Sequence, residues 1–70
     1  MRAYNIFRRK GEDAIWCAVP EDCPVPCFLI RETWTFSGKV DEPRATPTGF
    51  DEAAAEAGVH FNGFYLFHAF

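Results

Sequence analysis

The sequence predicts a small α+β domain: a single sheet of about four strands in the order β-β-β-α-β, with one short helix packed on one face. Three observations predict it. Short apolar segments of strand length alternate with turn residues, and one alanine-rich stretch has helical spacing. The chain has 70 residues, a length at which about 60% of the unfolded surface is buried on folding. Residues 1–70 are therefore expected to form one domain.

The first two strands are predicted at residues 2–9 and 14–19, joined by a turn over residues 10–13. Side chains alternate across a strand, so Tyr4 and Ile6 should share one face of the first strand and Phe7 the other. The second segment is apolar almost throughout. This pattern favours a central strand that is covered on both faces.

Three prolines within residues 20–26 predict a stiff loop, because proline cannot donate to a strand ladder. The apolar run at residues 27–30 fits either a short strand or one helical turn. Residues 33–37 alternate in polarity, which predicts a half-buried strand with Trp34 and Phe36 facing inward. This third strand could extend past Gly38 to Val40.

A short helix is expected after a polar loop at residues 41–48. Thr48 and Asp51 stand three residues apart, as in a capping box with Asp in place of Glu. Gly58 is the predicted terminator of the helix. The face expected to dock on the sheet, from its spacings of three and four, consists of Phe50, Ala53, Ala54 and Ala57.

Asn62-Gly63 predicts a turn into a final strand over residues 64–69. Phe64, Leu66 and His68 should share one face of this strand, opposite Tyr65, Phe67 and Ala69. Two pairings are open for it. It could run parallel to the third strand through a right-handed crossover, or antiparallel to the first strand.

Charge and hydropathy exclude several classes of protein. The net charge of −3 predicts no general affinity for nucleic acid or anionic lipid. No apolar run reaches the 18 residues that suggest a membrane span, and the first residues lack the apolar core of a signal peptide. We therefore expect a cytoplasmic protein without a membrane partner. Its three cysteines should be reduced there, and their odd number argues against a closed disulfide framework.

The cysteines raise one alternative function. Cys23 and Cys27 have the spacing of a zinc knuckle, and Cys17 with His60 or His68 could complete four ligands. The alternative is a zinc- or thiol-dependent protein. We favour buried or incidental thiols, because zinc sites usually contain two close pairs of ligands. No cofactor is predicted.

The basic cluster Arg8-Arg9-Lys10 raises a third reading, a weak binder of single-stranded nucleic acid. Arg2 would add charge to this cluster, and Tyr4 and Phe7 would supply stacking rings. The negative net charge argues against it, so nucleic acid is not the expected partner. We instead interpret the cluster as a solvated strand end whose charges protect an edge strand from aggregation.

No motif indicates catalysis: a glycine-rich phosphate loop, a dinucleotide fingerprint and a G-x-S-x-G elbow are all missing. The chain has twelve aromatic residues, more than so small a core requires. The leading hypothesis is a non-catalytic interaction module that binds a protein, most simply a second copy of itself. The predicted interaction surface consists of Trp16, Trp34, Phe64, Tyr65 and Phe67.

Overall fold

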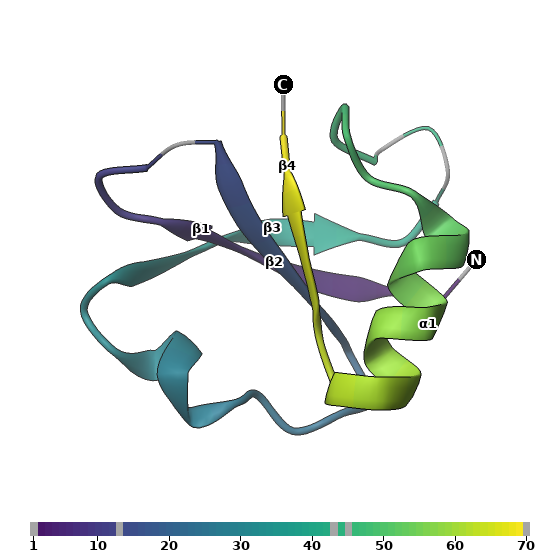
Figure 1. Ribbon diagram of the computed structural model, residues 1–70, viewed down its shortest axis with the longest axis horizontal. Helices are drawn as coiled ribbons and strands as arrows, with labels where there is room; N and C mark the ends of the chain where they lie inside the picture. Colours follow the sequence, from purple (N-terminus) through teal and green to yellow (C-terminus); the bar gives the residue numbers. More distant parts are fainter. Residues whose placement is uncertain (1, 13, 43, 45, 70) are drawn as a thin grey trace.

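The computed structural model describes residues 2–12, 14–42, 44 and 46–69. Within them it contains four strands, one α-helix and one 3-10 helix (Figure 1). In chain order these are β1 (Tyr4–Arg9), β2 (Ile15–Pro20), η1 (Cys27–Ile30), β3 (Trp34–Val40), α1 (Glu52–Asn62) and β4 (Tyr65–His68). The predicted α+β class and the order β-β-β-α-β are confirmed, and the ambiguous run at residues 27–30 is a helical turn.

The four strands form one antiparallel sheet in the order β3-β1-β2-β4. The central place predicted for the second strand is confirmed. Both pairings considered for the last strand are wrong, because β4 pairs antiparallel with β2. A pairing with β1 is impossible, since β2 and β3 already occupy both of its edges. The basic cluster at the end of β1 therefore lies on a central strand, and its interpretation as edge protection is wrong.

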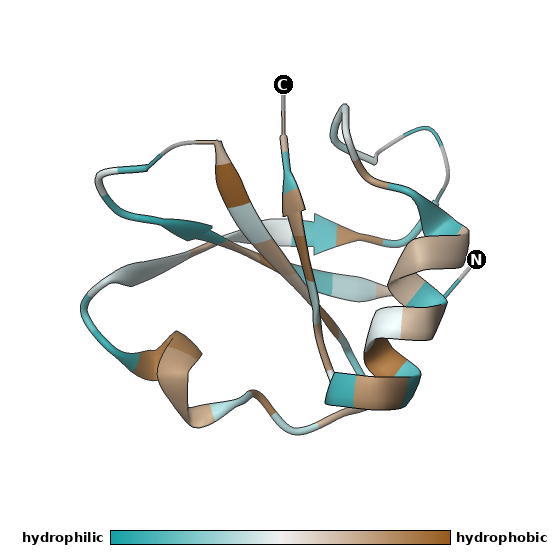
Figure 2. Ribbon diagram, in the orientation of Figure 1, coloured by the Kyte–Doolittle hydropathy of each residue, from teal (hydrophilic) through white to brown (hydrophobic). Residues whose placement is uncertain are grey.

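Apolar side chains pack on both faces of the sheet. On the face covered by α1 lies the helix-side cluster, which consists of Tyr4, Ile6, Ala18, Val40, Ala55 and Phe67. On the face covered by η1 lies the η1-side cluster, which consists of Cys17, Val19 and Leu29 with half-buried rings around them. The predicted alternation along the first strand, Tyr4 and Ile6 against Phe7, is confirmed by this division. In Figure 2 the β1–β2 turn is hydrophilic and η1 is apolar.

Helix α1 is longer than predicted and begins and ends at different signals. Asp51 is itself the N-cap, and its side chain accepts a hydrogen bond of 3.0 Å from the backbone N–H of Ala54. The helix ends at Gly63, whose φ of 84° is left-handed and whose N–H donates to the carbonyl of Val59. The prediction that the helix ends at Gly58 is therefore wrong.

Gly58 has a different role, because it lets α1 approach β4 closely. A Cβ atom at this position would lie 3.1 Å from the backbone oxygen of Phe64. The helix packs through Ala55 and Val59 rather than through the predicted face. Ala53, Ala54 and Ala57 are exposed. Phe50 does pack against the helix-side cluster, but it precedes the helix.

The edge strand β3 departs from simple alternation. Its pairing with β1 shifts between Ile6 and Phe7, so Ser37 has no partner in the register and forms a bulge. Phe36 lies on the η1 side of this edge strand. The prediction that its side chain faces inward is wrong, because η1 leaves it 58% exposed.

Candidate interaction surface

The five aromatic residues predicted as an interaction surface lie on both faces of the sheet. Trp16, Tyr65 and Phe67 pack with the helix-side cluster, whereas Trp34 and Phe64 pack with the η1-side cluster. Phe67 is buried and the other four are half-buried. The structure thus brings these residues together in two groups, and they do not form one continuous surface.

The large apolar side chains that are exposed lie elsewhere. They are Val25 in the loop before η1, Ile30 on η1, and Phe36 and Leu66 on the η1 side of the sheet, which are 39%, 76%, 58% and 50% exposed. We call these four residues the η1 surface. Phe61, which is 80% exposed, lies apart from them on α1. Val25, Ile30 and Leu66 are aliphatic, so the excess of aromatic residues does not indicate them. The alternation of polarity in β3 predicted, wrongly, that Phe36 lies in the core.

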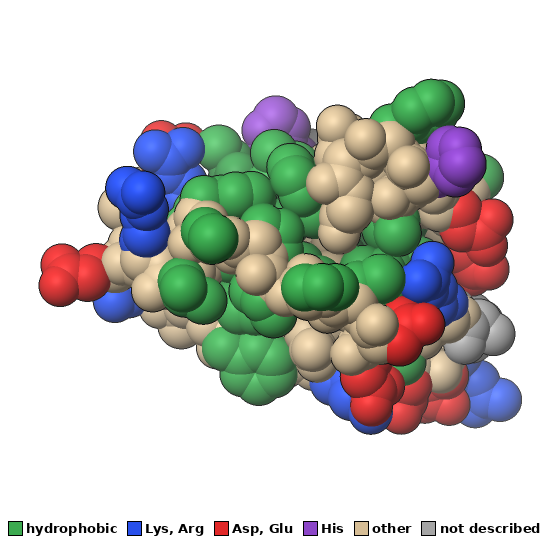
Figure 3. All heavy atoms as spheres, turned by 90° about the horizontal axis from the view of Figure 1, so that it is seen from below, with side chains coloured by type: hydrophobic (Ala, Val, Ile, Leu, Met, Phe, Trp, Pro, Cys, Tyr) green, Lys and Arg blue, Asp and Glu red, His purple; other side chains and the backbone are tan. Residues whose placement is uncertain are grey.

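Two members of the η1 surface, Phe36 on β3 and Leu66 on β4, lie on the two edge strands. Phe36 pairs with Phe7, Phe7 with Cys17, and Cys17 with Leu66, so Phe36 and Leu66 are the ends of one row that crosses the sheet on this face. Neighbouring strands lie about 4.8 Å apart, which separates Phe36 and Leu66 by roughly 14 Å. Between them, η1 covers the middle of the row. Figure 3 shows hydrophobic side chains gathered on this side of the molecule.

Three aromatic rings hold η1 in place. The ring of Phe28 meets those of Trp34 and Phe64 edge to face, at centroid distances of 5.8 and 5.0 Å. Leu29 is buried beneath. A helix of four residues is not stable alone, so these contacts determine its orientation. They leave Ile30, which follows Leu29 in the same helical turn, 76% exposed.

Opposite charges flank the η1 surface. The basic end, at the β1–β2 turn and the start of β3, carries Arg9, Lys10 and Arg31 with Glu12 and Glu32. Arg8 pairs with Trp16 and therefore lies on the helix side of the sheet. The acidic end, at the other ends of the same strands, carries Glu21, Asp22, Asp41 and Glu42 with Arg2 and Lys39. Figure 3 shows most Asp and Glu side chains to the right, and Lys and Arg side chains both at the left and among the acidic side chains at the lower right.

At the acidic end both cations are already paired. Arg2 contacts Asp22 at 3.2 Å, and Lys39 contacts Glu21 at 2.9 Å. The hydrogen bond from the Arg2 guanidinium holds the pKa of the Asp22 carboxyl below its usual value. Asp41 and Glu42 form no salt bridge with another described residue, so the free charge at this end is negative.

The residues proposed as zinc ligands are separated. Cys17 is buried in the η1-side cluster, Cys23 is half-buried against that cluster, and Cys27 is exposed. His60 lies on α1, which packs on the opposite face of the sheet. Within residues 2–12, 14–42, 44 and 46–69, no three His, Cys, Asp or Glu side chains are grouped so that they could hold a metal ion.

Burial raises the pKa of the Cys17 thiol from 9.0 to about 12. The folded state keeps this thiol protonated, whereas the thiol of the unfolded chain ionises above pH 9.0. The free energy of unfolding therefore falls as the pH rises above 9.0. At pH 10.5 the loss should be about 2 kcal/mol. Between pH 8 and 10.5, the free energy of unfolding measured in urea should fall less for Cys17→Ala than for the wild type. Cys23→Ala is the control, and its free energy of unfolding should fall as much as that of the wild type. An equal fall in all three proteins would contradict the prediction.

The residues of the nucleic-acid alternative also lie apart. Tyr4 is fully buried in the helix-side cluster, so its ring is not available to stack on a base. Arg2 is paired with Asp22 at the acidic end, away from the basic cluster of β1. Phe7 is half-buried under the ring of Phe36.

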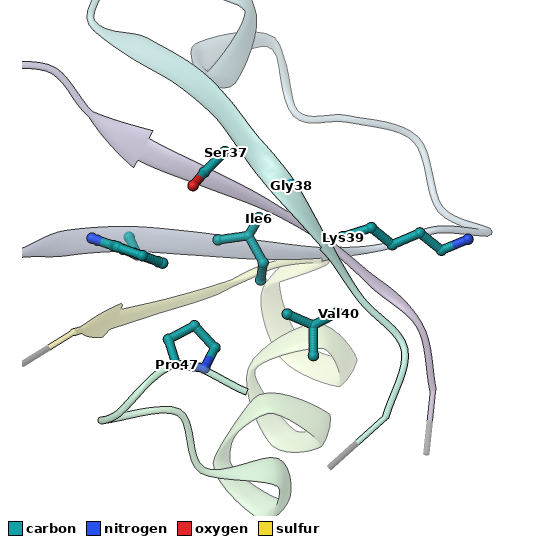
Figure 4. A pocket seen from close by; sticks show the side chains of 7 residues that line it. Ile6, Ser37, Gly38, Lys39, Val40 and Pro47 are labelled. Carbon is teal, nitrogen blue, oxygen red and sulfur yellow. The ribbon is translucent and has the colours of Figure 1, made fainter. Parts of the chain in front are cut away.

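A shallow cavity of about 300 Å³ opens on the helix side of the sheet (Figure 4). Its lining residues are Ile6, Trp16, Ser37, Gly38, Lys39, Val40 and Pro47. Ile6, Val40 and Pro47 point toward one another, whereas the side chain of Lys39 extends away from them toward its partner Glu21. The cavity has the smallest volume typical of ligand pockets, and none of its labelled residues directs a charge into it.

The fold and this surface define a class: a small α+β domain with an exposed apolar face between two charged ends. No family model matches the chain, and no curated protein or solved structure matches it. Across the described part of the chain, α1 is the one α-helix, and no helix has the length and apolar character needed to cross a membrane.

Proposed function

We propose that this chain is a cytoplasmic interaction module, without catalytic activity of its own, that binds a protein partner through the η1 surface. One observation carries the proposal: Ile30 on η1 and Phe36 and Leu66 on the face that η1 covers are exposed, with Val25 exposed in the loop before η1. Single exposed apolar side chains are common in monomers, whereas a group of them on one side of a domain is typical of an interaction site.

The surface is also well suited to binding with little loss of entropy. The ring of Phe36 rests edge-on against Phe7 at 5.6 Å, and η1 is held by the contacts of Phe28. Side chains ordered before binding lose less freedom when a partner arrives. Of the five aromatic residues first proposed, Trp34 and Phe64 remain part of the proposal as supports of this surface.

A photo-crosslinking experiment in the native host tests this function. A benzophenone side chain replaces Phe36 in one variant and Phe61, which lies outside the η1 surface, in the control. Phe61 is the more exposed of the two, so random collisions would label the control more strongly. We expect covalent protein adducts mainly from position 36. Adducts in equal amount from both positions, or none from position 36, would contradict the proposal.

A further inference from the structure

We propose that the partner is a second copy of the chain, docked η1 surface to η1 surface with the two β1 strands antiparallel. The inference rests on the proposed function and names its partner. The two-fold axis would lie within the interface and run across the strands. Such an interface is isologous, so each contact occurs twice.

The distribution of charge is the first argument for this arrangement. The described residues of the basic end carry three cations and two anions, a balance of +1. Those of the acidic end carry two cations and four anions, a balance of −2. Arg9, Lys10 and Arg31 form no salt bridge with other described residues. The free charges at the two ends thus have opposite signs.

Symmetry then selects the antiparallel arrangement. A two-fold axis across the strands places each basic end on the acidic end of the other copy, twice in the dimer. An axis along the strands would place like charges together. Complementary potentials determine orientation at interfaces, and like charges that face each other disfavour association. The same surface is therefore complementary to itself in only one of the two orientations.

Because the molecule is small, the interface of a stable dimer must include the charged ends of the η1 surface. A stable interface buries about 800 Å² on each partner, which is more than a sixth of the 4527 Å² that this chain exposes. The chain measures 29 × 25 × 18 Å, so a contact of that area covers most of one face. The ends of the η1 surface would therefore lie inside the interface or at its rim.

The edges of the sheet are poorly suited to pairing with a second copy, which leaves the face. On β3, the bulge at Ser37 and the charged Lys39 interrupt the free edge. On β4, the strand has four residues, and the backbone of Gly49 lies against that of His68. Short, bulged and covered edges are common ways in which proteins prevent edge-to-edge association.

A charge-swap experiment tests the arrangement. The first variant carries Arg9→Glu and Arg31→Glu, and the second carries Asp41→Lys and Glu42→Lys. Either variant alone would face like charges at both contacts, so its dimer dissociation constant should rise at least tenfold. In an equimolar mixture both contacts become attractive again, and a heterodimer should form. Native mass spectrometry at low ionic strength distinguishes the species, because the variants differ in mass.

Glu52→Lys with Glu56→Lys is the matched control, since both side chains are exposed on α1 away from the η1 surface. The control should dimerise as the wild type does. A wild-type dimer with no heterodimer in the mixture would overturn the antiparallel arrangement. A wild type that stays monomeric at all concentrations would overturn the second copy as partner. Neither result would overturn the proposed function, which fails only if the photo-crosslinker at position 36 captures no protein preferentially.

Discussion

Gly49→Ala should lower the free energy of unfolding by about 3 kcal/mol or more, the largest effect expected of any single methyl group here. Gly49 has a φ of 101°, a conformation that residues with a Cβ rarely adopt. An added Cβ would lie 1.9 Å from the backbone oxygen of His68 and 3.1 Å from its carbonyl carbon. Because these are backbone atoms, either the loop or the end of β4 must move.

Gly11→Ala is the matched control for this prediction. Gly11 also has a positive φ, of 83°, but no described atom beyond its own chain neighbours lies within 4 Å of the position its Cβ would take. This variant should therefore lose only the backbone contribution, about 1–2 kcal/mol. Urea unfolding of both variants separates the cost of the positive φ from the cost of the contact with the backbone of His68. If Gly49→Ala costs no more than Gly11→Ala, the close approach of the loop to β4 is absent in solution.

Phe50→Ala should cost about 3 kcal/mol, near the lower limit for removing a core phenylalanine because the ring is only half-buried. The ring of Phe50 meets those of Tyr4, Tyr65 and Phe67 at centroid distances of 5.4, 5.5 and 5.4 Å. A domain of this length has a total stability of roughly 4–10 kcal/mol. The variant would therefore lose a large fraction of it, and its melting temperature should fall clearly.

Phe61→Ala provides the comparison, because it removes the same ring from a site that is 80% exposed. The ring of Phe61 contacts His60, its neighbour in the chain. Surface changes of this kind usually stay within about 0.5 kcal/mol, and alanine favours the helix. Thermal unfolding followed by circular dichroism should thus separate the two variants. Similar melting temperatures for both would show that Phe50 does not anchor the loop before α1.

The secondary structure was largely predictable because its signals are local. Alternation placed Tyr4 and Ile6 opposite Phe7, and the continuous apolar run of the second strand indicated a central place in the sheet. The end of the helix was missed because two glycines compete for that role. Gly58 and Gly63 offer the same local signal, and only the approach of α1 to β4 shows that Gly58 belongs inside the helix.

The candidate surface was less predictable, because exposure depends on which segment covers which part of the sheet. Phe36 has the alternation of a core residue, yet η1 covers the middle of its face and leaves the ring at the edge in solvent. Ile30 follows Leu29 within one helical turn, yet Leu29 is buried and Ile30 is exposed. This difference depends on the orientation of η1, which the ring contacts of Phe28 determine. No periodic pattern in the sequence indicates these contacts.

Local patterns in the chain were therefore sufficient for the class of fold, the order of its elements and the face on which most strand residues lie, β3 beyond its bulge excepted. These properties depend on neighbours within a few positions, where backbone geometry sets the period. Only the tertiary structure determined the pairing of β4 with β2 and the position of the η1 surface between its basic and acidic ends. Both depend on contacts between segments far apart in the chain, and many such pairings bury similar apolar area, so packing selects among them.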